Sequence, residues 1–212
     1  MNFGISKYSF FSKKRLDVFR LISLLLLIPM MIVPVILNDY RYLYLYITQW
    51  SIEFATIATI FMFLSSKFPG NNFLKRMSLI LLESALFLNL GAMITFWYIF
   101  PSYYFCCIEV YWIVALSWSH VVPQIILLMN LFLCDINIRL RGLFFGTIVS
   151  VLYLVINYIR VAKLGNETTY HFLDWNEQEA IYNSMGFVGI SAISYVVIYY
   201  VKIRYFSGNY VA

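Results

Sequence analysis

The chain has 212 residues, of which 62% are apolar, 20% are aromatic and only 12% are charged. Soluble domains carry about 25% charged residues, and the charges of this chain gather between long apolar stretches. This composition excludes a disordered chain, a disulfide-rich secreted module and an ordinary soluble enzyme. The net charge of +5 does not indicate nucleic-acid binding, because the basic residues flank the apolar stretches, as they do in membrane proteins.

Six apolar stretches predict six membrane-spanning helices, because a helix crosses the bilayer core with about 20 mostly apolar residues. The expected spans are residues 20–37, 42–64, 77–100, 110–133, 143–161 and 181–201. A closed barrel would show alternating segments of about ten residues instead of continuous apolar runs. The first stretch lacks a small-residue cleavage site, so we expect it to be retained as a span. We therefore expect an all-α bundle that forms one membrane domain over residues 1–212.

The lysine and arginine residues predict that both termini lie in the cytosol. If the N-terminus is cytosolic, 12 of the 15 basic residues fall on the cytosolic side, and only Arg41, Arg160 and Lys163 fall outside. Such an imbalance in short connections is the positive-inside signal of multi-pass proteins. The longest exoplasmic connection, residues 163–179, carries the glycosylation sequon Asn166-Glu167-Thr168, which is a weak signal by itself. The host membrane is a plasma membrane or an endomembrane.

Polar side chains within the spans are the candidates for a site, because such groups need a partner or a cavity inside a bilayer. At about 1.5 Å per residue, Thr48 lies ~9 Å below the exoplasmic start of the second span and His120 lies ~15 Å below that of the fourth. The two side chains can meet if these spans pack together. The other polar residues that can support such a site are Gln49, Glu53, Ser117, Gln124 and Asn130.

Two further polar groups are expected to lie nearer the cytosolic side. Asn130 follows His120 by ten residues along the fourth span. Glu83 lies close to the cytosolic end of the third span, where its carboxylate can pair with Lys75 or Arg76.

The sequence contains no pattern typical of a metal or cofactor site. Its three cysteines are Cys106, Cys107 and Cys134, with no C-x-x-C spacing among them. No G-x-S-x-G, H-E-x-x-H or Walker sequence occurs either. We therefore expect no metal and no cofactor. The expected partners are membrane lipids rather than nucleic acid, and the sequence leaves the oligomeric state open.

Two segments resemble the androgen-induced-gene and rolling-stone families of six-span membrane proteins, including their bacterial six-span relatives. Residues 46–51, Tyr-Ile-Thr-Gln-Trp-Ser, resemble the start of the second span in these families. Residues 119–123, Ser-His-Val-Val-Pro, resemble their fourth span, although Asn130 stands where an acidic residue is common. The androgen-induced branch hydrolyses fatty acid esters of hydroxy fatty acids with an intramembrane Thr and a His. The resemblance therefore implies Thr48 as the nucleophile and His120 as the general base.

These observations leave three functions open. The leading hypothesis is a lipid-ester hydrolase, which requires the Thr48 hydroxyl and the His120 ring to lie within ~4 Å or one water of each other and to face a pocket open to lipid. The second is a non-catalytic family member in which Thr48, Glu53 and His120 form a structural or lipid-binding cluster. The third is a small-solute or proton transporter, which requires a polar path from Glu53 towards the cytosol. No oxyanion donor follows from the sequence, and the candidates are Gln49, Ser119 and Gln124.

Overall fold

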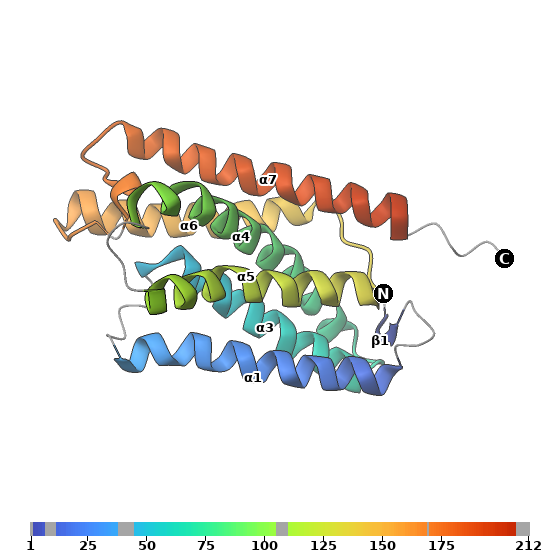
Figure 1. Cartoon of the computed structure of the whole chain (residues 1–212). Helices are drawn as coiled ribbons and strands as arrows, with labels where there is room; N and C mark the ends of the chain where they lie inside the picture. The colour runs from blue at the N-terminus through green and yellow to red at the C-terminus, as the bar shows by residue number, and fades with distance from the viewer. Residues whose placement is uncertain (1, 7–11, 38–44, 105–109, 169, 207–212) are drawn as a thin grey trace.

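The protein folds as a bundle of long helices. The computed structural model describes residues 2–6, 12–37, 45–104, 110–168 and 170–206. In these ranges six long helices run side by side (Figure 1). They are α1 (Lys13–Leu37), α3 (Ile47–Lys67), α4 (Asn72–Tyr104), α5 (Val110–Leu133), α6 (Gly142–Tyr158) and α7 (Glu179–Phe206). All six are long and apolar enough to cross a membrane, which confirms the expected number of spans for the part of the chain described.

The helix boundaries agree with the expected spans most closely at α5 and differ elsewhere. Helix α1 begins at Lys13 instead of residue 20, because Arg20 is buried inside the bundle and does not mark the membrane surface. Helix α3 begins at Ile47, since Tyr46 has an extended backbone (φ −107°, ψ 127°). The expected start of that span, residues 42–44, lies outside the described residues. Helix α6 continues into one π-helical turn, η1 (Ile159–Lys163).

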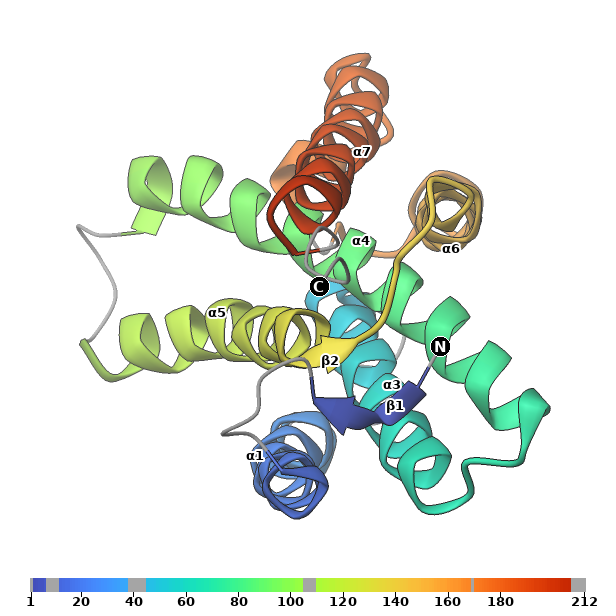
Figure 2. The ribbon, with the colours of Figure 1, turned by 90° about the vertical axis from the view of Figure 1, so that its right-hand side faces the viewer.

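Helix α4 lies at the centre of the bundle. It crosses obliquely between α3 and α5 on one side and α6 and α7 on the other (Figure 2). Its buried face carries Leu82, Leu86 and Phe87, none of which is exposed. Large apolar side chains such as Leu25 of α1 and Ile193 of α7 remain exposed on the outer helices. In a bilayer these outer faces would contact lipid, as the faces of a multi-pass membrane protein do.

A short pair of strands, which the sequence did not predict, closes one end of the bundle. Strand β1 (Asn2–Ser6) pairs antiparallel with β2 (Cys134–Asp135), the two residues that follow α5. The Phe3 side chain of β1 is buried in the same apolar cluster as Leu16 of α1 and Cys134 of β2. The last turn of α7 lies at the same end of the bundle (Figure 1). The first and last described residues therefore lie at one end of the bundle, while the side of the membrane on which this end lies stays a prediction.

The Glu83 side chain is fully buried and pairs differently from the expectation. Its carboxylate accepts a hydrogen bond from the backbone N–H of Arg139 at 2.8 Å, and the Arg139 guanidinium lies 3.4 Å away. The expected pairing with Lys75 or Arg76 is wrong, because these residues lie two or more turns back along the same helix, about 10 Å or more away. The hydroxyl of Tyr195 also donates to the Arg139 carbonyl. These bonds hold the connection between α5 and α6 against α4 and α7.

Candidate active site

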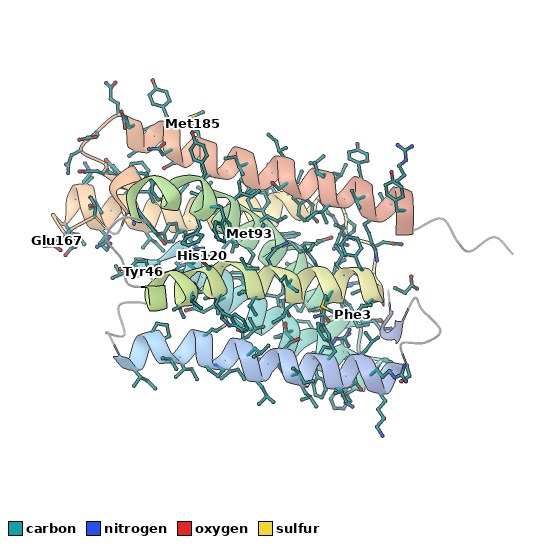
Figure 3. All side chains as sticks on the ribbon, in the orientation of Figure 1. Phe3, Tyr46, Met93, His120, Glu167 and Met185 are labelled. Carbon is teal, nitrogen blue, oxygen red and sulfur yellow. The ribbon has the colours of Figure 1, made fainter. Side chains whose placement is uncertain are left out.

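The structure brings Thr48 and His120 into direct contact. Helices α3 and α5 pack against each other, and the Thr48 Oγ1 lies 2.8 Å from the His120 Nε2. This confirms the expectation that the two side chains lie within ~4 Å. Figure 3 shows His120 inside the bundle, in the half that holds Tyr46 and away from Phe3. With the predicted orientation, this half lies in the exoplasmic leaflet.

The hydrogen bonds of the imidazole define which nitrogen carries the proton. The His120 Nδ1 lies 2.7 Å from the carbonyl oxygen of Leu116, one turn earlier on α5. A carbonyl oxygen can only accept, so Nδ1 must be the protonated nitrogen and Nε2 must be the acceptor. In the neutral ring, the Thr48 hydroxyl therefore donates a hydrogen bond to Nε2. This is the arrangement that general-base activation of a hydroxyl requires.

Aromatic packing holds the ring in this orientation. The Phe96 ring of α4 stacks on the imidazole with centroids 3.9 Å apart and planes 15° from parallel. The Ser119 hydroxyl donates to the Leu116 carbonyl at 2.8 Å and lies 3.3 Å from Nδ1. Three helices thus fix the site, since α3 supplies the hydroxyl, α5 the imidazole and α4 the stacked ring.

Thr48 lies in the first turn of α3, which favours negative charge near its hydroxyl. The N-cap residue Tyr46 makes no side-chain hydrogen bond to the helix, and the Tyr46 carbonyl accepts from the Trp50 N–H. The N–H groups of the three residues before Trp50 precede this first helical bond. The positive end of the helix dipole therefore lies beside the Thr48 Oγ1. The sequence had placed Thr48 deeper in its span, because the interruption at Tyr46 has no proline or glycine to mark it.

Two of the expected supporting residues lie on the neighbouring turns of α3. The Gln49 amide donates to the Met31 carbonyl of α1 at 2.9 Å, so this side chain joins α3 to α1. Glu53, one turn further on, reaches the Gln49 side chain with its carboxyl group. The Glu53 Oε1 is buried and has no hydrogen-bond partner among the described residues.

The other three supporting residues lie on α5 and have different surroundings. Ser117 is half-buried, and no described hydrogen bond joins it to Thr48 or His120. Gln124 is only 1% exposed, and neither its Nε2 nor its Oε1 has a partner in the described part of the chain. Asn130 lies apart from the pair, since its Oδ1 accepts from the Arg20 Nε at 3.0 Å.

Arg20 forms a second polar cluster, which sequence reasoning missed because the residue resembled a basic flank. Its guanidinium is fully buried and also donates to the carbonyls of Met62 and Phe3 and to the Cys134 Sγ. The signal that could have indicated it is the polar residue Asn130 at the matching depth of the fourth span.

The metal-ligating residue types do not gather in the described ranges. Within those ranges, no group of three or more His, Cys, Asp or Glu residues could hold a metal ion. Cys134 is free and buried, and burial raises the pKa of its thiol despite the nearby Arg20 guanidinium. Cys106 and Cys107 lie outside the described residues.

Comparisons with known proteins leave the site to be interpreted from its own geometry. No protein-family model, curated protein or solved structure matches the chain.

Proposed function

We propose that this protein is an intramembrane hydrolase of lipid esters, with Thr48 as the nucleophile and His120 as the general base. The observation that carries the proposal is the 2.8 Å contact between the Thr48 Oγ1 and the His120 Nε2, in the tautomer that the Leu116 carbonyl imposes. A threonine hydroxyl is a weak nucleophile until a base within hydrogen-bond reach accepts its proton.

The reaction follows the two-step course of covalent ester hydrolysis. The Thr48 Oγ1 attacks the ester carbonyl carbon while its proton passes to the His120 Nε2. The bond from the carbonyl carbon to the alcohol oxygen then breaks, and the imidazolium returns the proton to the departing alcohol. A water molecule, deprotonated by Nε2, releases the fatty acid from the acyl-threonine and restores the Thr48 hydroxyl.

The surroundings of the pair favour an uncharged, lipid-borne ester. The hydrogen bonds and stacking of His120 involve the Thr48 hydroxyl, the Leu116 carbonyl, the Ser119 hydroxyl and the Phe96 ring, and none of these groups is charged. The Thr48 and His120 side chains are half-buried, so in a bilayer an ester that is carried by an acyl chain can approach them from the lipid. The resemblance of residues 46–51 and 119–123 to the androgen-induced family supports the same reaction.

A lipid-binding, non-catalytic role is the second candidate. It is favoured by the buried and unpartnered atoms of Glu53 and Gln124 in the described structure, which a bound lipid with polar groups could satisfy. A transporter is less well supported, because it requires a polar path from Glu53 towards the cytosol. The next polar residues along α3 do not contribute to such a path. The hydroxyls of Thr56 and Thr59 donate to carbonyls of their own helix.

Hydrolysis of a chromogenic ester by the purified protein tests the proposal. The assay uses p-nitrophenyl octanoate in detergent micelles, together with labelling by a fluorophosphonate probe. Thr48→Val removes the nucleophilic hydroxyl, and we expect it to abolish labelling. His120→Gln removes the general base, and we expect it to lower the rate of hydrolysis by about 10²–10⁴-fold. Both replacements keep a similar side-chain volume. Thr48→Ser should retain activity, because it preserves the hydroxyl.

The matched control is Thr56→Val, which removes a hydroxyl that donates only to the backbone of α3. We expect this variant to label and hydrolyse as the wild type does. Equal labelling of the wild type and Thr48→Val would exclude Thr48 as the nucleophile. Inactive wild-type protein that binds lipid in a Thr48-dependent manner would favour the second candidate.

A further inference from the structure

Among the buried polar side chains of the described structure that lack hydrogen-bond partners, Gln124 is the one with two unpaired atoms. It is 1% exposed, and both atoms of its amide lack a hydrogen-bond partner among the described residues. An unpaired amide in an apolar interior destabilises the folded state. A protein can retain such a group when a ligand supplies the missing hydrogen bonds. A buried side chain without a partner is therefore a candidate for a functional role.

The position of Gln124 places this amide beside the reacting pair. Gln124 follows His120 by four residues on α5, so the two side chains lie on one helix face with Cβ atoms about 5–6 Å apart. Side chains on a helix lean towards its N-terminus. From this spacing we expect the Gln124 amide to lean towards the His120 ring and the Thr48 hydroxyl that contacts it.

The other candidate donors already have partners. The Gln49 amide donates to the Met31 carbonyl, and the Ser119 hydroxyl donates to the Leu116 carbonyl. Of the three side chains that the sequence offers for an oxyanion, only Gln124 has no described partner for its N–H groups.

From these observations we propose that Gln124 is a catalytic residue which donates a hydrogen bond from its Nε2 to the carbonyl oxygen of the substrate. This inference rests on the proposed hydrolysis. When the Thr48 Oγ1 adds to the carbonyl carbon, the π electrons of the C=O bond move to the oxygen and make it an anion. A donor held in a water-poor site stabilises that anion strongly. The first-turn N–H groups of α3, beside Thr48, supply further positive potential.

Replacement of Gln124 by side chains of similar size tests this role. Gln124→Met and Gln124→Leu both remove the amide donor and the amide acceptor. For p-nitrophenyl octanoate we expect each variant to lower kcat by about 10²–10³-fold while KM changes less than threefold, because the bond strengthens in the transition state. The rate of fluorophosphonate labelling at Thr48 should fall in parallel.

Thermal unfolding in detergent separates catalysis from structure. Since the amide is unpaired in the free protein, we expect Gln124→Met to leave the Tm unchanged or to raise it. The matched control is Ser150→Ala, which removes an unpartnered buried hydroxyl on α6 and should leave both kcat and Tm unchanged or raise Tm slightly.

The outcomes distinguish this inference from the function on which it rests. A Gln124→Met variant with wild-type kcat overturns the role of Gln124, while Thr48-dependent hydrolysis still supports the proposed function. A loss of kcat accompanied by a marked fall in Tm assigns Gln124 a structural role and also overturns the inference. A wild-type protein with no Thr48-dependent hydrolysis overturns both.

Discussion

At the scale of single residues, the bundle contains two polar centres that differ in how completely their groups are hydrogen-bonded. The Arg20 guanidinium is fully buried, and it donates to Asn130, to the carbonyls of Met62 and Phe3, and to the Cys134 Sγ. A charge that is so completely paired is costly to disturb, because loss of one partner leaves the others unsatisfied. The surroundings of the Thr48–His120 pair are less completely hydrogen-bonded, because Glu53 and Gln124, on the following turns of the same helices, have atoms without a partner in the described structure.

The first residue-scale prediction concerns this arginine. We expect Arg20→Met to lower the free energy of unfolding by about 3–5 kcal/mol, because it leaves the Asn130 amide and the Phe3 carbonyl without their donor. Thermal unfolding in detergent measures the effect. Lys14→Met, which changes an exposed residue on the same helix, should leave Tm nearly unaltered. Equal shifts in the two variants would contradict a structural role for the cluster.

At the scale of elements, close approach between helices depends on glycines in α6. A Cβ added to Gly146 would clash with the Phe87 ring of α4, so a side chain at this position requires a shift of the neighbouring helix. Gly186 of α7 offers the opposite environment, because an added Cβ meets nothing within 4 Å.

These two glycines make a matched pair of predictions. We expect Gly146→Ala to lower the free energy of unfolding by about 1–3 kcal/mol through overpacking against α4. Gly186→Ala should raise it by about 0.5–1 kcal/mol, because alanine loses less backbone entropy in a helix. Thermal unfolding of the two variants checks both signs. Stabilisation of Gly146→Ala would show that α4 and α6 pack less closely than the structure places them.

The second prediction at this scale is that strand β1 shields the Cys134 thiol of β2 from reagents. Burial raises the pKa of Cys134, so the reactive thiolate is scarce at neutral pH. In a background with Cys106→Ser and Cys107→Ser, deletion of residues 2–6 should increase the rate of N-ethylmaleimide alkylation at least about tenfold, since it uncovers the thiol. The same protein unfolded in detergent provides the upper limit of reactivity. An unchanged rate would mean that β1 does not protect this end of the bundle.

At the scale of the whole molecule, the charge distribution predicts how the bundle is oriented. The end that holds β1 and the last turn of α7 also carries most of the basic residues. With this end in the cytosol, the Thr48–His120 pair lies in the exoplasmic leaflet.

Labelling of single cysteines tests that orientation. In a cysteine-free background, Glu167→Cys and Asn72→Cys introduce thiols at exposed positions while leaving every lysine and arginine in place. We expect a membrane-impermeant maleimide applied to intact cells to label the first variant and spare the second, if the protein reaches the cell surface. In isolated endomembrane vesicles the exoplasmic side is the lumen, so the Glu167→Cys thiol should be labelled only after permeabilisation. Reversed labelling would place the pair in the cytosolic leaflet.

The sequence by itself determined the number of helices and their approximate positions, because the length of an apolar run and the width of a bilayer core suffice for that. It also indicated Thr48 and His120, since polar groups stand out in apolar spans. The tertiary structure alone decided which polar groups meet. Asn130 and Arg20 lie 110 residues apart, and the contact between Glu83 and Arg139 spans 56 residues. Such partners, like the start of α3 at Ile47 and the pairing of β1 with β2, depend on how the helices pack against one another, which apolar periodicity does not encode.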